Sequence, residues 1–93
     1  GAPFRAAADG VVAYAGDAIE GFGNLLLIKH PGGWMTAYAH AEELLVTRGK
    51  SVAKGEIVGR VGQTGSVDEP QLHFELRRGR VPVNPVNHLP AGS

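Results

Sequence analysis

Cysteine is absent from this chain of 93 residues, which excludes both a disulfide framework and thiol catalysis. Charge of one sign is not in excess either: nine basic residues balance nine acidic ones, so net charge gives no reason to expect a nucleic-acid partner. No apolar run is long enough to span a bilayer. The chain length and its 43% of hydrophobic residues suffice for one small domain with a single core.

Short apolar segments separated by glycine predict a fold made of β-strands. Residues 24–30 include an aliphatic run from Leu25 to Ile28, typical of a strand buried on both faces. The turn signal Pro31-Gly32-Gly33 then predicts a hairpin with a returning strand at 34–40. Further strands are expected at 11–15, 56–61, 71–77 and 81–83, and one helical turn at 42–45. The sequence therefore predicts an all-β fold, a small antiparallel sandwich or barrel.

The segment 71–77 alternates between apolar and polar residues, so a strand there would bury one set and expose the other. The apolar set is Leu72, Phe74 and Leu76, and the polar set is Gln71, His73, Glu75 and Arg77. Gln71 and His73 share a face at a spacing that would let a metal ligand and an acid/base histidine serve one site. An amide, however, neither relays protons at neutral pH nor binds zinc well. The pattern indicates a hydrolase scaffold that has lost its chemistry.

Three further histidines are present. His40 ends the segment 34–40 and shares a face with Tyr38 by the period-two rule, so it is either an acid/base group or a polar strand end. His30 lies at a turn and His88 in a proline-rich tail, where structural or surface roles dominate. A zinc site needs about three protein ligands, which His40 and His73 alone cannot supply.

An ordered set of motifs covers essentially the whole chain. The motifs are Asp9-Gly10-Val11-Val12-Ala13-Tyr14-Ala15-Gly16, Gly21-Phe22-Gly23-Asn24-Leu25, Thr36-Ala37-Tyr38-Ala39-His40, Val52-Ala53-Lys54-Gly55, Gly62-Gln63-Thr64-Gly65, Leu72-His73-Phe74-Glu75-Leu76-Arg77 and Pro82-Val83-Asn84-Pro85. On these motifs the chain resembles the LytM/lysostaphin-type peptidase domain, and within that family the degenerate, division-associated subgroup (EnvC/NlpD/DipM-like). The resemblance implies a small antiparallel β-sandwich with a groove, a duplicated-hybrid-motif-like fold, over residues 1–93.

The resemblance also implies which residues of this chain match the catalytic and zinc-binding positions of the family. Active members of the family hold zinc through an HxxxD-type motif and the second histidine of an HxH motif, and two further histidines act on the substrate. By position, His40 matches one catalytic histidine, His73 matches the metal ligand of HxH, and Gln71 replaces the other catalytic histidine. The HxxxD segment would precede Gly1, so the chain is expected to be a fragment without that segment. The resemblance thus implies no catalytic residues, no complete zinc site and no cofactor in this chain.

Members of the degenerate subgroup activate or recruit peptidoglycan hydrolases during bacterial cell division and wall remodelling. The resemblance therefore implies a location in the periplasm or cell envelope, at the division site. The implied partner is a hydrolase such as an N-acetylmuramoyl-L-alanine amidase, with peptidoglycan as a second candidate ligand. The expected binding groove is lined by Tyr38, His40, Gln71, His73 and Arg77, with loop contributions from Phe22 and Trp34.

Two alternatives belong to other classes. The chain could come from a zinc metalloendopeptidase of peptidoglycan whose N-terminal ligands lie before Gly1, and the residues preceding Gly1 would decide this. Residues 46–62 also resemble part of the biotinyl/lipoyl carrier domains. In those domains the modified residue is a lysine in a Met-Lys context. Because Met35 is followed by Thr36, we reject the carrier function.

Overall fold

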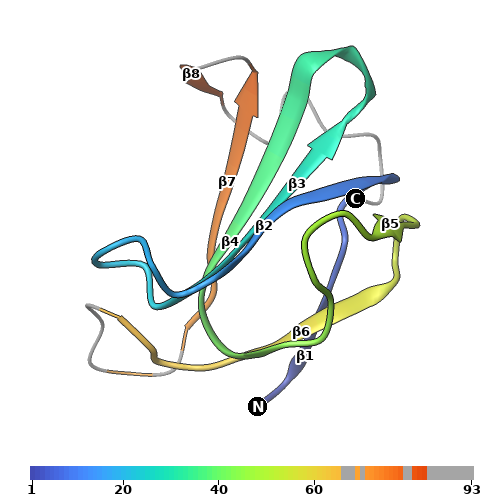
Figure 1. The fold of residues 1–93 in the computed structure, drawn as a ribbon. Coiled ribbons are helices and arrows are strands. Elements are labelled where there is room, and N and C mark those ends of the chain that lie inside the picture. The colour runs from blue at the N-terminus through green and yellow to red at the C-terminus, as the bar shows by residue number, and fades with distance from the viewer. Residues whose placement is uncertain (66–68, 70, 79–80, 84–93) are drawn as a thin grey trace.

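The computed structural model describes residues 1–65, 69, 71–78 and 81–83, and it folds them into one antiparallel sheet (Figure 1). The strands are β1 (Pro3–Arg5), β2 (Gly10–Gly16), β3 (Asn24–His30), β4 (Trp34–Leu44), β5 (Ser51–Val52), β6 (Ile57–Val61), β7 (His73–Arg78) and β8 (Val81–Val83). A single 3-10 turn, η1 (Pro31–Gly33), joins β3 to β4. The predicted all-β antiparallel fold is confirmed.

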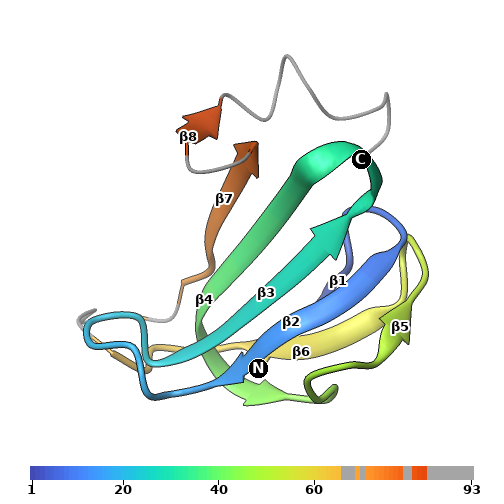
Figure 2. The same cartoon turned by 45° about the horizontal axis from the view of Figure 1, so that its top comes forward.

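Strand β4 organises the sheet because it changes partner along its length. The strand order is β1-β6-β4-β3-β2-β5, while β7 and then β8 branch from β4. Residues 34–39 of β4 pair with β7, and residues 41–44 pair with β6. The sheet therefore curls, and β1 and β6 cross behind β2, β3 and β4 (Figure 2). The two layers expected of a sandwich come from one sheet that folds over on itself.

The core lies between these two layers. Leu26 and Ile28 of β3 are fully buried there, as is Tyr38 of β4. The Tyr38 ring stacks on Phe4 at 5.5 Å between centroids and meets Phe74 edge-on at 5.4 Å. Fully burying an aliphatic or aromatic side chain stabilises a fold by about 1.5–3 kcal/mol. The packing of β1 onto β4 through these rings is therefore a main source of stability.

The opposite face of β3 and β4 is also buried. Leu25, Ala37 and Ala39 form a second apolar cluster, against which Tyr14 and Phe22 pack. The aliphatic run in β3 thus contributes to both faces, as its lack of alternation predicts. This second face carries the candidate site.

One glycine is required by the core. A Cβ atom at Gly59 would lie 2.5 Å from the Phe4 ring, a distance that no side chain tolerates. Gly59 therefore lets β6 approach close enough for Phe4 to reach Tyr38.

One sequence prediction of local structure is wrong, and two short strands were not predicted. The helical turn expected at 42–45 is wrong, because β4 continues to Leu44 through pairing of Glu43 with Arg60 and of Leu44 with Gly59. Sheet pairing supplies backbone partners that an isolated turn lacks. The short strands β1 and β5 were not predicted, since neither carries an alternating pattern. Within the described ranges, no helix has the length and apolar character needed to cross a membrane.

Candidate functional site

A bulge in β4 at His40 shapes the site. Pairing runs from Asn24 with Ala41 to Leu26 with Tyr38, so β4 contains one residue more than β3 over this stretch. His40 has a φ of 65°, the one positive value at a non-glycine position among the residues that the structure describes. Such a conformation costs about 1–3 kcal/mol and persists only where its surroundings hold it. The bulge marks the point where β4 exchanges β7 for β6.

The bulge changes which residues share a face. Alternation along β4 predicts Tyr38 on the same exposed face as His40, but Tyr38 is 1% exposed and lies in the core with Phe4 and Phe74. The extra residue and the positive φ break the period of two, so His40 turns to the other side of the sheet. Tyr38 therefore does not line an exposed surface, and its predicted place in the binding groove is corrected.

His40 and His73 come together on the second face. Their ring centroids lie 6.2 Å apart in an edge-to-face arrangement. His73 stands across from Ala39 in the pairing of β4 with β7, and the Phe22 ring lies 6.4 Å from it. We call this surface the histidine face, made of Phe22, Ala37, Ala39, His40, His73 and Glu75. The two histidines singled out by the sequence are thus neighbours on one surface.

A row of polar side chains along β7 extends the histidine face. Glu75 Oε1 lies 3.3 Å from His73 Nε2, and Glu75 Oε2 accepts hydrogen bonds from Arg77 Nη2 at 2.7 Å and Nε at 3.1 Å. Burial would raise the pKa of Glu75, but the hydrogen bonds from Arg77 and His73 outweigh it and lower the pKa. Glu75 is therefore an anion that orients both neighbours.

The remaining predicted site residues lie around this row. Gln71 is exposed, and its backbone N–H donates to the carbonyl of Gly62 at 2.7 Å. Trp34 lies at the far end of the β4–β7 pair, roughly 20 Å along the strand from His40, where the Arg78 guanidinium sits 5.2 Å from the ring centroid. Phe22, in contrast, contacts the histidine pair. His88 lies outside the described residues.

The histidine face has few of the features of a catalytic zinc site. Zinc in such a site takes three protein ligands plus an open position. In the part of the chain that the structure describes, no three His, Cys, Asp or Glu side chains are grouped so that they could hold a metal ion. The pair of imidazoles can donate and accept hydrogen bonds and can pack against apolar groups.

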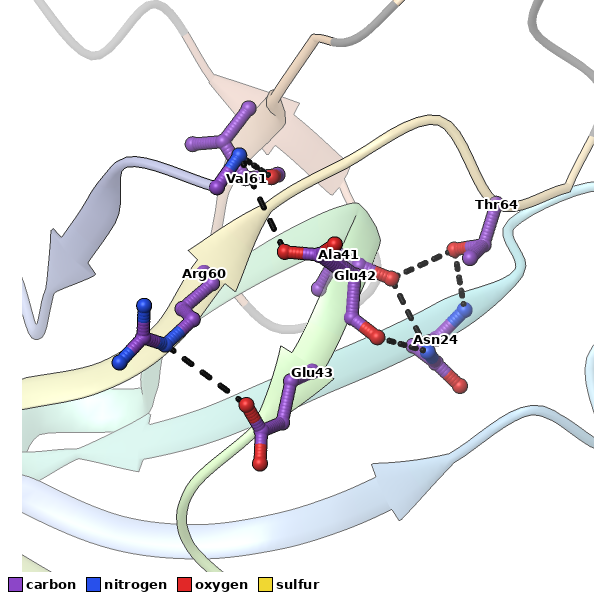
Figure 3. Close-up of polar contacts among 8 residues, drawn as sticks. Asn24, Ala41, Glu42, Glu43, Arg60, Val61 and Thr64 are labelled. Atoms are coloured by element: carbon purple, nitrogen blue, oxygen red, sulfur yellow. Dashed lines mark hydrogen bonds and ion pairs between the residues drawn. The ribbon is translucent and has the colours of Figure 1, made fainter.

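Two residues that the sequence reasoning did not single out hold the bulge. Asn24, the first residue of β3, and Thr64, in the loop after β6, both hydrogen-bond to the carbonyl of Ala41 (Figure 3). Thr64 also presents its own carbonyl to the His40 ring, at 2.8 Å from Nδ1. Each residue is a small polar side chain beside a glycine, Gly23 or Gly65, and this was the signal available in the sequence.

The loops that carry these residues touch backbone to backbone. A Cβ atom at Gly23, whose φ is 62°, would lie 2.4 Å from the Thr64 backbone. Gly23 therefore serves two purposes, the left-handed conformation and the close approach to Thr64.

A contrasting polar chain runs through the core. His30 Nδ1 lies 2.7 Å from the Asp9 carbonyl, and its Nε2 lies 2.7 Å from Thr36 Oγ1. Thr36 Oγ1 then lies 2.8 Å from the Tyr38 hydroxyl, which accepts the Ala7 N–H at 3.0 Å. Burial raises the pKa of Tyr38 above its usual value, and the hydrogen bonds with Thr36 and Ala7 offset part of the rise. This chain is a structural element of the core.

The curled sheet with two histidines on one face is the fold of the lysostaphin-type peptidase domains. The catalytic domain of lysostaphin from Staphylococcus simulans superposes with a TM-score of 0.88 at 28% identity, over 94% of this chain and 69% of that one. Residues 1–85 match Peptidase family M23. The chain belongs to this family.

Two similar proteins have names that fit the division-associated branch that the motifs indicate. Over 97% of its own length, this chain is 48% identical to the cell division protein DipM of Caulobacter vibrioides. Over 91% of its own length, this chain is 44% identical to the murein hydrolase activator NlpD of Escherichia coli. The chain spans 16% of DipM and 22% of NlpD. The resemblance to the division-associated LytM-type proteins is confirmed.

Proposed function

We propose that this chain is a non-catalytic LytM-type domain that activates or recruits a peptidoglycan hydrolase during cell division and wall remodelling. The proposed partner is an N-acetylmuramoyl-L-alanine amidase, and the proposed place is the periplasm or cell envelope at the division site. The names of two relatives, a cell division protein and a murein hydrolase activator, support this proposal. Because the chain covers 16% of one relative and 22% of the other, the proposal concerns this domain and not the full length of those relatives.

The observation that carries the proposal is the composition of the histidine face. His40 and His73 meet there at 6.2 Å. By the resemblance, the nearby Gln71 matches a position that holds a catalytic histidine in active members of the family. A glutamine cannot act as the acid or base that hydrolysis at neutral pH requires. We therefore propose that the face offers contacts to a partner in place of the chemistry of a peptidase.

The same face suits a protein segment. Ala37 and Ala39 are 3% and 0% exposed, so they support the face from beneath, and the surface open to a partner comes from the side chains around them. Phe22 adds an aromatic surface, and His73 with the Glu75–Arg77 pair adds polar groups of both signs. Interfaces combine an apolar centre with polar groups in this way. We propose that His40, Gln71, His73 and Arg77 contact the hydrolase, with peptidoglycan as a further ligand.

Dye-labelled sacculi test the proposal in three reactions: the domain alone, a purified amidase alone, and both together. We expect no dye release from the domain alone and faster release from the mixture than from the amidase alone. The variant Gln71→His is the control, and we expect it to remain inactive alone because the set of metal ligands stays incomplete. Release by the unmodified domain alone, abolished by a chelator, would establish the zinc endopeptidase alternative instead.

Metal content gives an independent test. A single imidazole holds zinc weakly compared with the three or four ligands of protein sites. We therefore expect elemental analysis of the purified protein to find no stoichiometric zinc. About one zinc per chain, lost on His73→Ala, would contradict the proposal.

A further inference from the structure

Asn24 and Thr64 reach His40 from two separate parts of the chain. We propose that these two residues are positioning residues, which fix the His40 ring on the histidine face so that one ring nitrogen meets the binding partner. The role in binding rests on the function proposed above. The positioning itself rests only on the geometry of this domain.

Asn24 acts on the backbone that follows the bulge. Its Nδ2 donates to the carbonyls of Ala41 at 2.9 Å and of Glu42 at 3.2 Å (Figure 3). These are the two carbonyls next to His40 on its C-terminal side. An amide side chain that supplies donors to both carbonyls holds β4 in the bulged path, which the regular pairing with β3 alone would not give.

Thr64 connects the backbone of the bulge to the His40 ring. Its Oγ1 donates to the Ala41 carbonyl at 2.7 Å and accepts the Asn24 N–H at 3.0 Å. Its carbonyl lies 2.8 Å from His40 Nδ1. The backbone N–H of His40 donates to the Phe22 carbonyl at 2.8 Å. The positive φ of His40 is therefore held on both sides, by the loop before β3 and by the loop after β6.

This arrangement sets the tautomer of the neutral His40 ring. A carbonyl only accepts, so His40 Nδ1 carries the hydrogen in the contact with Thr64. In the neutral ring Nε2 is then an acceptor, and no residue in the described ranges hydrogen-bonds to it. The groups that Nε2 can recognise are donors, such as a backbone N–H or a hydroxyl of the partner. Asn24 and Thr64 thus hold His40 Nε2 as a fixed hydrogen-bond acceptor beside His73.

Side-chain NMR of the histidine nitrogens tests the positioning without any partner. We expect the neutral form of the wild-type His40 ring to be a single tautomer, with the hydrogen on Nδ1. Thr64→Val removes the hydroxyl that anchors the loop, and Asn24→Asp removes the side-chain donors with little change in size. Both variants should give His40 a mixture of tautomers, while Thr64→Ser, which keeps the hydroxyl, should preserve the wild-type signals.

Thr36→Val is the matched control for stability, because it also removes a buried threonine hydroxyl but lies in the core chain with His30 and Tyr38. It should lower the melting temperature and leave the His40 signals unchanged. In the amidase assay, Thr64→Val and Asn24→Asp should raise the half-maximal concentration of the domain roughly tenfold, and Thr36→Val should not.

Unchanged His40 signals in both Thr64→Val and Asn24→Asp would overturn the positioning role, whatever their melting temperatures. Altered signals with undiminished stimulation of the amidase would overturn its link to binding. If the wild-type domain does not stimulate any amidase while the His40 signals respond as expected, the proposed function fails and the positioning role stands.

Discussion

His30 and His40 are equally buried, each 8% exposed, yet their surroundings differ in kind. Both ring nitrogens of His30 have partners inside the protein, in the Asp9 carbonyl and Thr36 Oγ1. Among the residues that the structure describes, His40 has one such partner, the Thr64 carbonyl, and its ring meets that of His73 edge to face. A buried polar group with all its hydrogen bonds made serves the fold. The ring nitrogen of His40 that lacks such a bond is the one that the proposed binding role would use.

The same contrast holds for the two faces of the sheet. The core face combines large apolar side chains with a closed chain of hydrogen bonds. The histidine face combines small side chains with polar groups that are partly exposed, such as His73 at 46% of its side chain. Substitutions on the core face should therefore change stability, and substitutions on the histidine face should change binding.

The largest expected effect on stability is at Leu76, which is 3% exposed on β7. Leu76→Ala should lower the free energy of unfolding by about 2–5 kcal/mol, because it removes buried methyl groups and leaves a cavity. Arg77→Ala, at the next position and on the other face, should cost less than about 1 kcal/mol, since it breaks a partly exposed ion pair. Urea denaturation of both variants measures the difference. Equal costs would mean that β7 does not separate the two faces.

Removing the Tyr38 hydroxyl should have the next largest effect. Tyr38→Phe leaves the Ala7 N–H without its acceptor and removes one of the two partners of the Thr36 hydroxyl, which should cost about 1–3 kcal/mol. Tyr14→Phe is the matched control, because the Tyr14 hydroxyl accepts the Ala18 N–H at an exposed position, and it should cost within roughly 0.5 kcal/mol. Thermal unfolding monitored by circular dichroism compares them. Indistinguishable melting temperatures would argue that the buried chain is not needed for the core.

The smallest expected effect is the pH dependence at Glu75. Its pKa is lowered in the folded protein, so its contribution to stability is present above the unfolded pKa of about 4.3 and is lost as the pH falls through the folded value. Glu75→Gln should therefore lower stability by less than about 1 kcal/mol at neutral pH, with a difference that shrinks in acid.

Glu43→Gln is the control for Glu75, because Glu43 is 58% exposed and lies 3.6 Å from Arg60. We expect a smaller change for it. Melting temperatures of the wild type and both variants between neutral and acid pH measure the comparison. A difference at Glu75 that grows as the pH falls would reverse the expected sign and refute the assignment of Glu75 as the stabilising anion.

The sequence allowed much of the fold to be predicted, because local patterns determine most strands. The aliphatic run at 25–28 predicted β3 with its observed bounds, and the alternation at 71–77 predicted which side of β7 is buried. The end of β4 was not predictable in this way. Its pairing with β6 depends on residues about 17 positions away along the chain, such as Arg60 opposite Glu43, and no local pattern shows this.

The site was predicted in part. His40 and His73 were singled out from sequence, and they are neighbours in the structure. The bulge that brings them together was not foreseen, because the positive φ of His40 depends on hydrogen bonds from Asn24 and Thr64. The same bulge explains why Tyr38 belongs to the core. The binding roles of Gln71 and Arg77 stay predictions.

The most direct test of the account is the concentration of domain that gives half-maximal stimulation of a periplasmic amidase, measured for the wild type and for His73→Ala. His73 is exposed, so its loss should leave the melting temperature nearly unchanged. The loss of one anchoring contact commonly costs on the order of 1–3 kcal/mol of binding, and the half-maximal concentration should rise roughly tenfold to hundredfold. A folded His73→Ala domain that stimulates the amidase at the wild-type concentration would contradict the account.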